Sequence, residues 1–144
     1  MTTVRDATPE DADDIYRLLS AFVTSHQPDR AVFDGATFPR IIEDASAGRA
    51  ELFVAEQNSS VVGYLLAVRM PTLFAGGTIL ELLELTVAEP MRGRGTGSAL
   101  IRAAQAKARA AKDVEVTVPT RRAAGFYRAL GFHETAVHLK WSTT

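Results

Sequence analysis

The sequence contains no cysteine, which excludes disulfide bridges, thiolate metal sites and covalent catalysis by a thiol. The sequence also lacks an excess of either charge, because 17 acidic side chains offset 16 basic ones and leave a net charge of −1. Without an overall basic field, nucleic acid is not an expected partner. The first residues are polar and acidic, unlike a signal peptide, and no apolar run approaches the ~20 residues of a membrane span. We therefore expect a soluble, cytoplasmic protein with no membrane partner.

Several familiar catalytic and binding motifs are missing as well. The chain has no Gly-Lys-Ser/Thr triplet of a Walker loop, and Ser98 and Leu100 occupy the places of the last glycine in a dinucleotide fingerprint. The three histidines, His26, His133 and His138, show no metal-ligand spacing, and no serine lies in a nucleophile elbow. We expect no metal site.

The 144 residues, of which 47% are hydrophobic, suffice for one domain with its own core, which we expect to span residues 1–144. Apolar periodicity predicts a helix after Thr8, with Pro9 at its first position and an apolar face that includes Phe22 and Val23. Two β-rich runs joined by a polar turn predict a hairpin. The expected strands are Thr2–Arg5, Glu51–Gln57, Val61–Met70, Ile79–Val87, Asp113–Pro119 and Ala136–Trp141, and the further expected helices are Arg40–Ala47, one opening at Gly97 or Ser98, and Arg121–Leu130.

The chain concentrates its chemistry in Leu85–Leu100, where an apolar strand runs through a glycine-rich turn into a helix. Alternating glycines at 93, 95 and 97 allow the backbone N–H groups to approach an anion. The unpaired amides and the dipole at the start of the helix attract negative charge at the same place, and Arg92 and Arg94 add to it. The turn is therefore predicted to bind a pyrophosphate; the alternative is a plain strand-to-helix turn.

Two glutamates interrupt the otherwise apolar strand Ile79–Val87. Side chains alternate along a regular strand, so Glu81 and Glu84 are expected on opposite faces, where they cannot line one site. A β-bulge between them would change this arrangement.

A second signature, Phe126-Tyr127 followed by Gly131-Phe132, lies behind the Arg92-x-x-Gly95-x-Gly97 turn. In this order and spacing the two motifs resemble the GNAT superfamily of acyl-CoA-dependent N-acetyltransferases, and the likeness extends over nearly the whole chain. It implies a mixed α/β (α+β) fold. The expected sheet is mostly antiparallel, has six to seven strands and a splayed parallel pair, and is flanked by about four helices.

The resemblance also implies acetyl-CoA as the donor. The amides of the turn would hold its pyrophosphate, and the pantetheine arm would pair with the end of the central strand. Thr120 stands where many relatives have asparagine. The implied coenzyme-binding residues are Leu85, Thr86, Val87, Arg92, Gly93, Arg94, Gly95, Thr96, Gly97, Ser98 and Thr120.

The expected reaction is direct attack of a primary amine, on a small molecule or a peptide, on the acetyl thioester. Glu81 is the first candidate for the base, because an apolar strand would desolvate its carboxylate, and Glu84 is the second. A backbone N–H near Leu85 or Thr86 would stabilise the oxyanion. By the resemblance, Tyr127 would hydrogen-bond to the leaving sulfur.

Two other functions stay open at this stage: a non-catalytic acyl-CoA-binding or regulatory module of the same fold, and a nucleotide-binding protein. The acidic residues Glu81, Glu84, Asp29 and Asp34 hint at a cationic acceptor. A homodimer through the last strand, with Trp141 near its end, is a candidate assembly.

Overall fold

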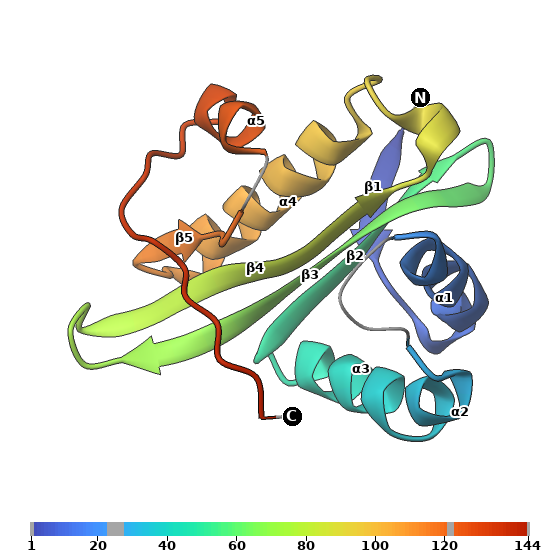
Figure 1. Cartoon of the computed structure of the whole chain (residues 1–144), viewed down its shortest axis with the longest axis horizontal. Helices are drawn as coiled ribbons and strands as arrows, with labels where there is room; N and C mark the ends of the chain where they lie inside the picture. Colours follow the sequence, from blue (N-terminus) through green and yellow to red (C-terminus); the bar gives the residue numbers. More distant parts are fainter. Residues whose placement is uncertain (1, 23–27, 121–122, 144) are drawn as a thin grey trace.

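The computed structural model describes residues 2–22, 28–120 and 123–143. Within these ranges the strands form one five-stranded sheet in the order β1-β2-β3-β4-β5 (Figure 1). Neighbours among the first four strands are antiparallel, and β4 with β5 is parallel. The strands are β1 (Thr3–Asp6), β2 (Ala50–Gln57), β3 (Ser60–Thr72), β4 (Gly77–Val87) and β5 (Glu115–Thr117).

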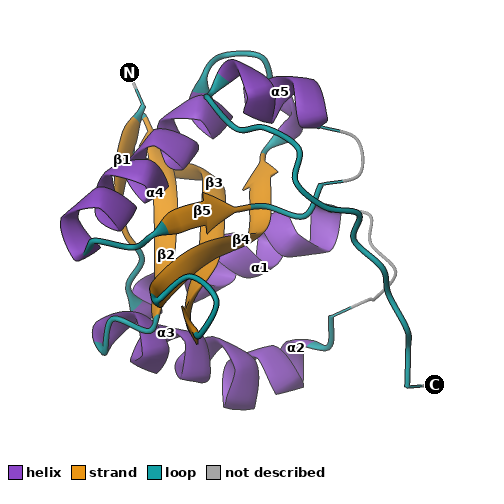
Figure 2. Ribbon diagram, turned by 90° about the vertical axis from the view of Figure 1, so that its left-hand side faces the viewer, coloured by secondary structure: helices purple, strands orange, loops and turns teal. Residues whose placement is uncertain are grey.

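Helices cover both faces of this sheet (Figure 2). One face carries α1 (Ala12–Ala21) and α3 (Phe38–Ser46), and the other carries α4 (Thr96–Ala111) and α5 (Ala124–Ala129). The shorter helical segments are η1 (Pro9–Asp11), α2 (Arg30–Val32), the π-helical turn η2 (Phe33–Thr37) and η3 (Glu89–Met91). None of the helices in the described ranges is long and apolar enough to cross a membrane.

The core is divided by the sheet into two clusters. The α4 side contains Leu65, Leu80, Leu100 and Ile101, all fully buried, and the alanines of α4 let the helix approach the strands closely. The opposite side packs Tyr64 and its neighbours on β2 and β3 against α1 and α3, with Phe33 stacked on Phe38. Apolar residues at helical spacing in α1 and alternating apolar residues in β2 account for these two buried faces.

The mixed fold with a parallel pair at one edge agrees with the sequence prediction, but two details differ. The described chain has five strands, because residues 136–141 form no strand and their apolar side chains lie almost fully exposed. The helix predicted at Arg121–Leu130 begins at Ala124, and Arg121 and Arg122 lie outside the described residues. An alternating apolar pattern marks a strand only when a neighbouring strand offers backbone partners.

The parallel pair is splayed, as predicted. Only Ile79–Glu81 of β4 pair with Glu115–Thr117 of β5. Beyond this point β4 continues through Leu82–Val87 with no pairing to β5, so its backbone is open along that edge.

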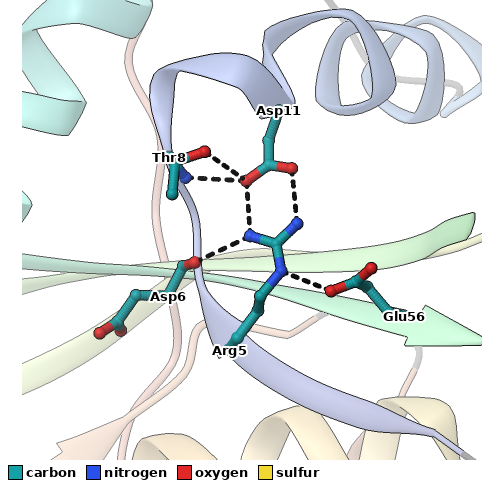
Figure 3. A network of polar contacts seen from close by, with 5 residues as sticks. All are labelled: Arg5, Asp6, Thr8, Asp11 and Glu56. Carbon is teal, nitrogen blue, oxygen red and sulfur yellow. Dashed lines mark hydrogen bonds and ion pairs between the residues drawn. The ribbon is translucent and has the colours of Figure 1, made fainter. Parts of the chain in front are cut away.

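A polar network ties the N-terminal strand to the first helical turn (Figure 3). The Arg5 guanidinium donates two hydrogen bonds of 2.8 Å to the Asp11 carboxylate, and its Nε donates to Glu56 on β2. Asp11 also accepts from the Thr8 backbone N–H at 2.8 Å and so completes the cap of η1. Hydrogen bonds from Arg5 lower the pKa of the buried Asp11 carboxyl below its ordinary value, although burial opposes the shift.

We expect Asp11→Asn to lower the free energy of unfolding at pH 7 by about 2 kcal/mol, because two charge-assisted hydrogen bonds are weakened in a buried place. Since the folded-state pKa of Asp11 is lowered, this stabilisation is present above the unfolded pKa of about 3.9 and is lost as the pH falls through the folded value. Urea unfolding at several pH values measures both effects. Asp14→Asn is the control, because its pair with Arg17 is solvent-exposed and is expected to contribute less than about 0.5 kcal/mol. Equal losses in the two variants would contradict the prediction.

Candidate active site

The strand-to-helix turn has the geometry that its glycines predict. After β4 and η3, the backbone takes positive φ values at Gly93 (+77°) and Gly95 (+85°), and Gly95 precedes the first residue of α4. Positive φ is the conformation that a side chain disfavours, so both glycines are required by the path of the chain. This path brings the first turn of α4 and the end of β4 to the same cleft.

An open cleft of about 600 Å³ lies where the turn, the start of α4 and the end of β4 meet. All but three of the predicted coenzyme-binding residues line it. They are Leu85, Thr86, Val87, Arg92, Gly93, Gly95, Gly97 and Ser98. From the sequence, only the order of these strand and turn residues was known. The structure shows that they line one cleft.

The other three predicted residues surround the cleft without lining it. Arg94 is exposed on the turn. Thr96 is buried with its hydroxyl unpartnered within the described part of the chain, and its methyl group faces Gly63 on β3. The Thr120 hydroxyl accepts a hydrogen bond of 3.2 Å from the Ala123 N–H, at the start of α5. Ala123 is the residue that directly precedes α5.

Three residues that sequence reasoning did not assign also line the cleft, namely Phe22, Met91 and Phe126. Helical periodicity placed Phe22 on the buried face of the first helix, but α1 ends at Ala21 and the extended Phe22 turns into the cleft. Val23, predicted on the same face, lies outside the described residues. Phe126 belongs to the Phe-Tyr signature, and its ring lies 3.4 Å from where a Cβ on Gly97 would be.

A β-bulge places the two glutamates of β4 on one face, which overturns the expectation from regular alternation. Leu66 of β3 is opposite Glu84 and Ala67 is opposite Leu82, so Leu83 has no partner and is the extra residue. Glu81 and Glu84 then both lie on the sheet face opposite α4. A bulge leaves no mark in the sequence that distinguishes it from regular alternation.

Each glutamate has a different partner. The Tyr64 hydroxyl donates a hydrogen bond of 2.7 Å to Oε1 of Glu84, which is exposed. The Thr117 hydroxyl of β5 donates to Oε1 of the half-buried Glu81 at 3.1 Å. The other two predicted acids have local roles, since Asp29 caps α2 and Asp34 pairs with Arg30.

Tyr127 lies on α5 in the core cluster on the α4 side, and its ring meets those of Phe126 and Phe132 edge-on. Burial raises the pKa of its phenol above the ordinary value, so the group is protonated at neutral pH. The Tyr127 ring contacts Phe126, which lines the cleft, but Tyr127 itself does not line it.

Two cationic side chains give the turn a positive charge. Arg92 and Arg94 are exposed, and Nε of Arg92 donates to the Val87 carbonyl at 3.2 Å, which fixes this side chain against the end of β4. Positive charge and oriented amides at one end of the cleft suit an anionic ligand. Within the described ranges, no group of three or more histidine and acidic side chains is placed to hold a metal ion.

The sequence model of the acetyltransferase (GNAT) domain matches residues 48–134, which include β2 to α5 and the whole turn. The chain belongs to this family. Members of the GNAT family use acetyl-CoA as donor, and the chain is accordingly an acyltransferase.

Relatives of this GNAT chain extend the likeness over nearly its full length. It is 29% identical over 136 residues to an aminoalkylphosphonate N-acetyltransferase from Salmonella typhimurium, which covers 92% of this chain and 85% of the relative. Among solved structures, a transcriptional regulator from Bacillus halodurans shares 25% identity with a TM-score of 0.86 over 99% of both chains. A glucosamine-6-phosphate N-acetyltransferase from Arabidopsis thaliana has the same fold, with a TM-score of 0.84 at 15% identity over 100% of this chain and 99% of the other.

The turn geometry predicts opposite effects for two neighbouring glycines. Gly95→Ala is expected to lower the free energy of unfolding by about 1 kcal/mol, because alanine is disfavoured at a φ of +85°. Gly97→Ala is the matched control: Gly97 is helical, and its new methyl would only reach contact distance of Phe126, so stability is expected to stay constant or rise by up to about 1 kcal/mol. Urea unfolding of both variants measures the difference, and a loss at residue 97 as large as at residue 95 would contradict it.

Proposed function

We propose that this chain transfers the acetyl group of acetyl-CoA to a primary amine, of a small molecule or a peptide, by direct attack on the thioester. The observation that supports the proposal best is the cleft in which the glycine turn, the start of α4 and the open edge of β4 meet. It offers backbone donors to a pyrophosphate at one end and a strand edge to a pantetheine amide at the other.

On this proposal the coenzyme enters with its pyrophosphate over Gly93–Gly97, and Arg92 and Arg94 add charge. The pantetheine arm pairs with the backbone of Leu85–Val87, where β4 has parted from β5. A backbone N–H near Leu85 or Thr86 then stabilises the oxyanion of the tetrahedral intermediate.

The acceptor amine approaches from the face of β4 opposite α4, where Glu81 and Glu84 lie. An alkylamine with a pKa near ~10.4 is almost wholly protonated at pH 7, so a carboxylate that takes the proton makes the nucleophile available. The acidic character of this face suits a cationic acceptor. The Salmonella relative is named for aminoalkylphosphonates, so an amine that carries a phosphonate belongs in any substrate panel.

Calorimetric titration with acetyl-CoA, free coenzyme A and ATP tests the donor, and thiol release with a panel of amines tests the transfer. We expect saturable binding of both coenzymes, no binding of ATP, and amine-dependent thiol release. Binding without thiol release for any amine would favour the non-catalytic acyl-CoA-binding module, and binding of ATP alone would favour a nucleotide-binding protein.

Tyr127 is proposed to hydrogen-bond to the sulfur of the leaving coenzyme. Its phenol is protonated, as such a donor must be, and its ring contacts Phe126, which lines the cleft. Tyr127→Phe is expected to lower kcat about tenfold or more while the Kd for acetyl-CoA stays within about twofold. Unchanged turnover would remove Tyr127 from the mechanism and leave it a core residue.

We also propose that two copies pair through the C-terminal segment. Val137, Leu139 and Trp141 alternate along an extended stretch and are at least 84% exposed, while β5 is an edge strand. We expect the chain to sediment as a dimer and the double variant Leu139→Glu with Trp141→Glu as a monomer. Phe74→Glu, at the exposed tip of the β3–β4 hairpin, is the control that should leave the dimer intact.

A further inference from the structure

Tyr64 is a buried tyrosine with an unusual partner. It lies on β3 in the core cluster that packs against α1 and α3, and only 2% of its surface is exposed. Buried tyrosine hydroxyls need a hydrogen-bond partner. Here the partner is Oε1 of Glu84, at 2.7 Å, a carboxylate on the neighbouring strand whose residue is exposed to solvent.

The contact depends on the bulge in β4. Tyr64 is paired with Thr86, and Glu84 is paired with Leu66, so the hydroxyl reaches diagonally to a residue on the same face. With regular alternation from Glu81 onward, Glu84 would point toward α4. The extra residue Leu83 therefore makes the Tyr64–Glu84 pair.

The same tyrosine connects Glu84 with the donor cleft. Thr86 lines the cleft and lies directly opposite Tyr64 in the β3–β4 ladder. Along this face of β4 the order from the cleft is Thr86, Glu84, Glu81, so Glu84 lies nearer to the cleft. Glu81 is farther away and is held by Thr117 from β5.

We infer that Tyr64 is a positioning residue that holds the Glu84 carboxylate beside the acceptor amine, so that Glu84 rather than Glu81 takes the amine proton. The inference rests on the proposed acetyl transfer. The hydrogen bond occupies Oε1 of Glu84, which leaves Oε2 for the amine. Because Tyr64 is packed on every side, it restricts an exposed side chain that would otherwise sample several rotamers.

Transfer of one acetyl group to an ammonium ion releases one proton. The ammonium nitrogen loses one proton to Glu84 and attacks the carbonyl carbon, so that a C–N bond forms and the thioester electrons move to oxygen. The C–S bond then breaks, and the second nitrogen proton is released as the coenzyme sulfur takes up one proton. Glu84 returns its proton to solvent, and the sum is one amide, one thiol and one released proton.

The two possible roles of Tyr64, filling the core and positioning Glu84, lead to different kinetics when Tyr64 is substituted. Loss of packing would lower stability and would act on kcat whether or not Glu84 is a carboxylate. Loss of positioning would lower kcat only while Glu84 can accept a proton, and it would spare the binding of acetyl-CoA.

The test is a double-mutant cycle of Tyr64→Phe and Glu84→Gln, measured as thiol release with the best amine of the panel. We expect Tyr64→Phe to lower kcat about tenfold and Glu84→Gln about a hundredfold, while the Kd for acetyl-CoA stays within about twofold. Tyr64→Phe should have no further effect when Glu84 is already glutamine. Glu81→Gln should lower kcat less than Glu84→Gln does.

Tyr16→Phe is the matched control. Its hydroxyl, like that of Tyr64, donates a hydrogen bond of 2.7 Å beside the same core cluster, but to the Pro28 carbonyl. It should lose comparable stability and keep its turnover. If wild type and all amines give no thiol release, the proposed function fails and the inference fails with it. Two outcomes with an active wild type would overturn the inference alone. In one, Tyr64→Phe is as active as wild type. In the other, Tyr64→Phe lowers kcat equally whether residue 84 is glutamate or glutamine.

Discussion

The extra residue Leu83 in β4 is the constraint on which the site depends. It lets Leu80, Leu82, Leu85 and Val87 all face the α4 side, although a regular strand would turn the second pair away from the first. The opposite face thereby gains both glutamates, and the apolar side chains keep their burial. A bulge leaves one residue outside the ladder, and Leu83 is accordingly half exposed. The packing of apolar side chains and the placement of polar ones thus have one common cause.

The cleft also depends on the early separation of β4 and β5. Three paired residues hold the strands together at the end far from the turn, where Arg69 also binds Asp113 just before β5. From Leu82 onward the strand has a free edge, and the start of α4 lies at its far end. A longer pairing would occupy backbone groups that are open at this edge of β4. The cleft therefore results from incomplete sheet formation combined with a tight turn at Gly93 and Gly95.

The resemblance to the GNAT family predicted the fold class and the splayed pair, and local patterns predicted the turn and the central strand. Glycine spacing determines the turn, and the apolar run of β4 determines a central strand. What the sequence could not predict depends on contacts between distant residues. The bulge at Leu83 is set by the pairing with Leu66 and Ala67, and Phe22 enters the cleft because α1 stops one residue before it. Residues 136–141, expected as a strand, pair with no strand among the described residues, although β5 is an edge strand.

The sheet separates two hydrophobic clusters that have no buried residue in common. Of the described residues that line the cleft, Phe22 alone precedes β2. A substitution that disturbs the packing on one side of the sheet can therefore affect the other side only through the shared strands. The helices α1 and α3 pack only on the side opposite α4, whereas Val4 of β1 packs on the α4 side and Phe22 lines the cleft. Substitutions in α1 and α3 can therefore reshape one face of the sheet while the packing of α4 and α5 on the other face is preserved.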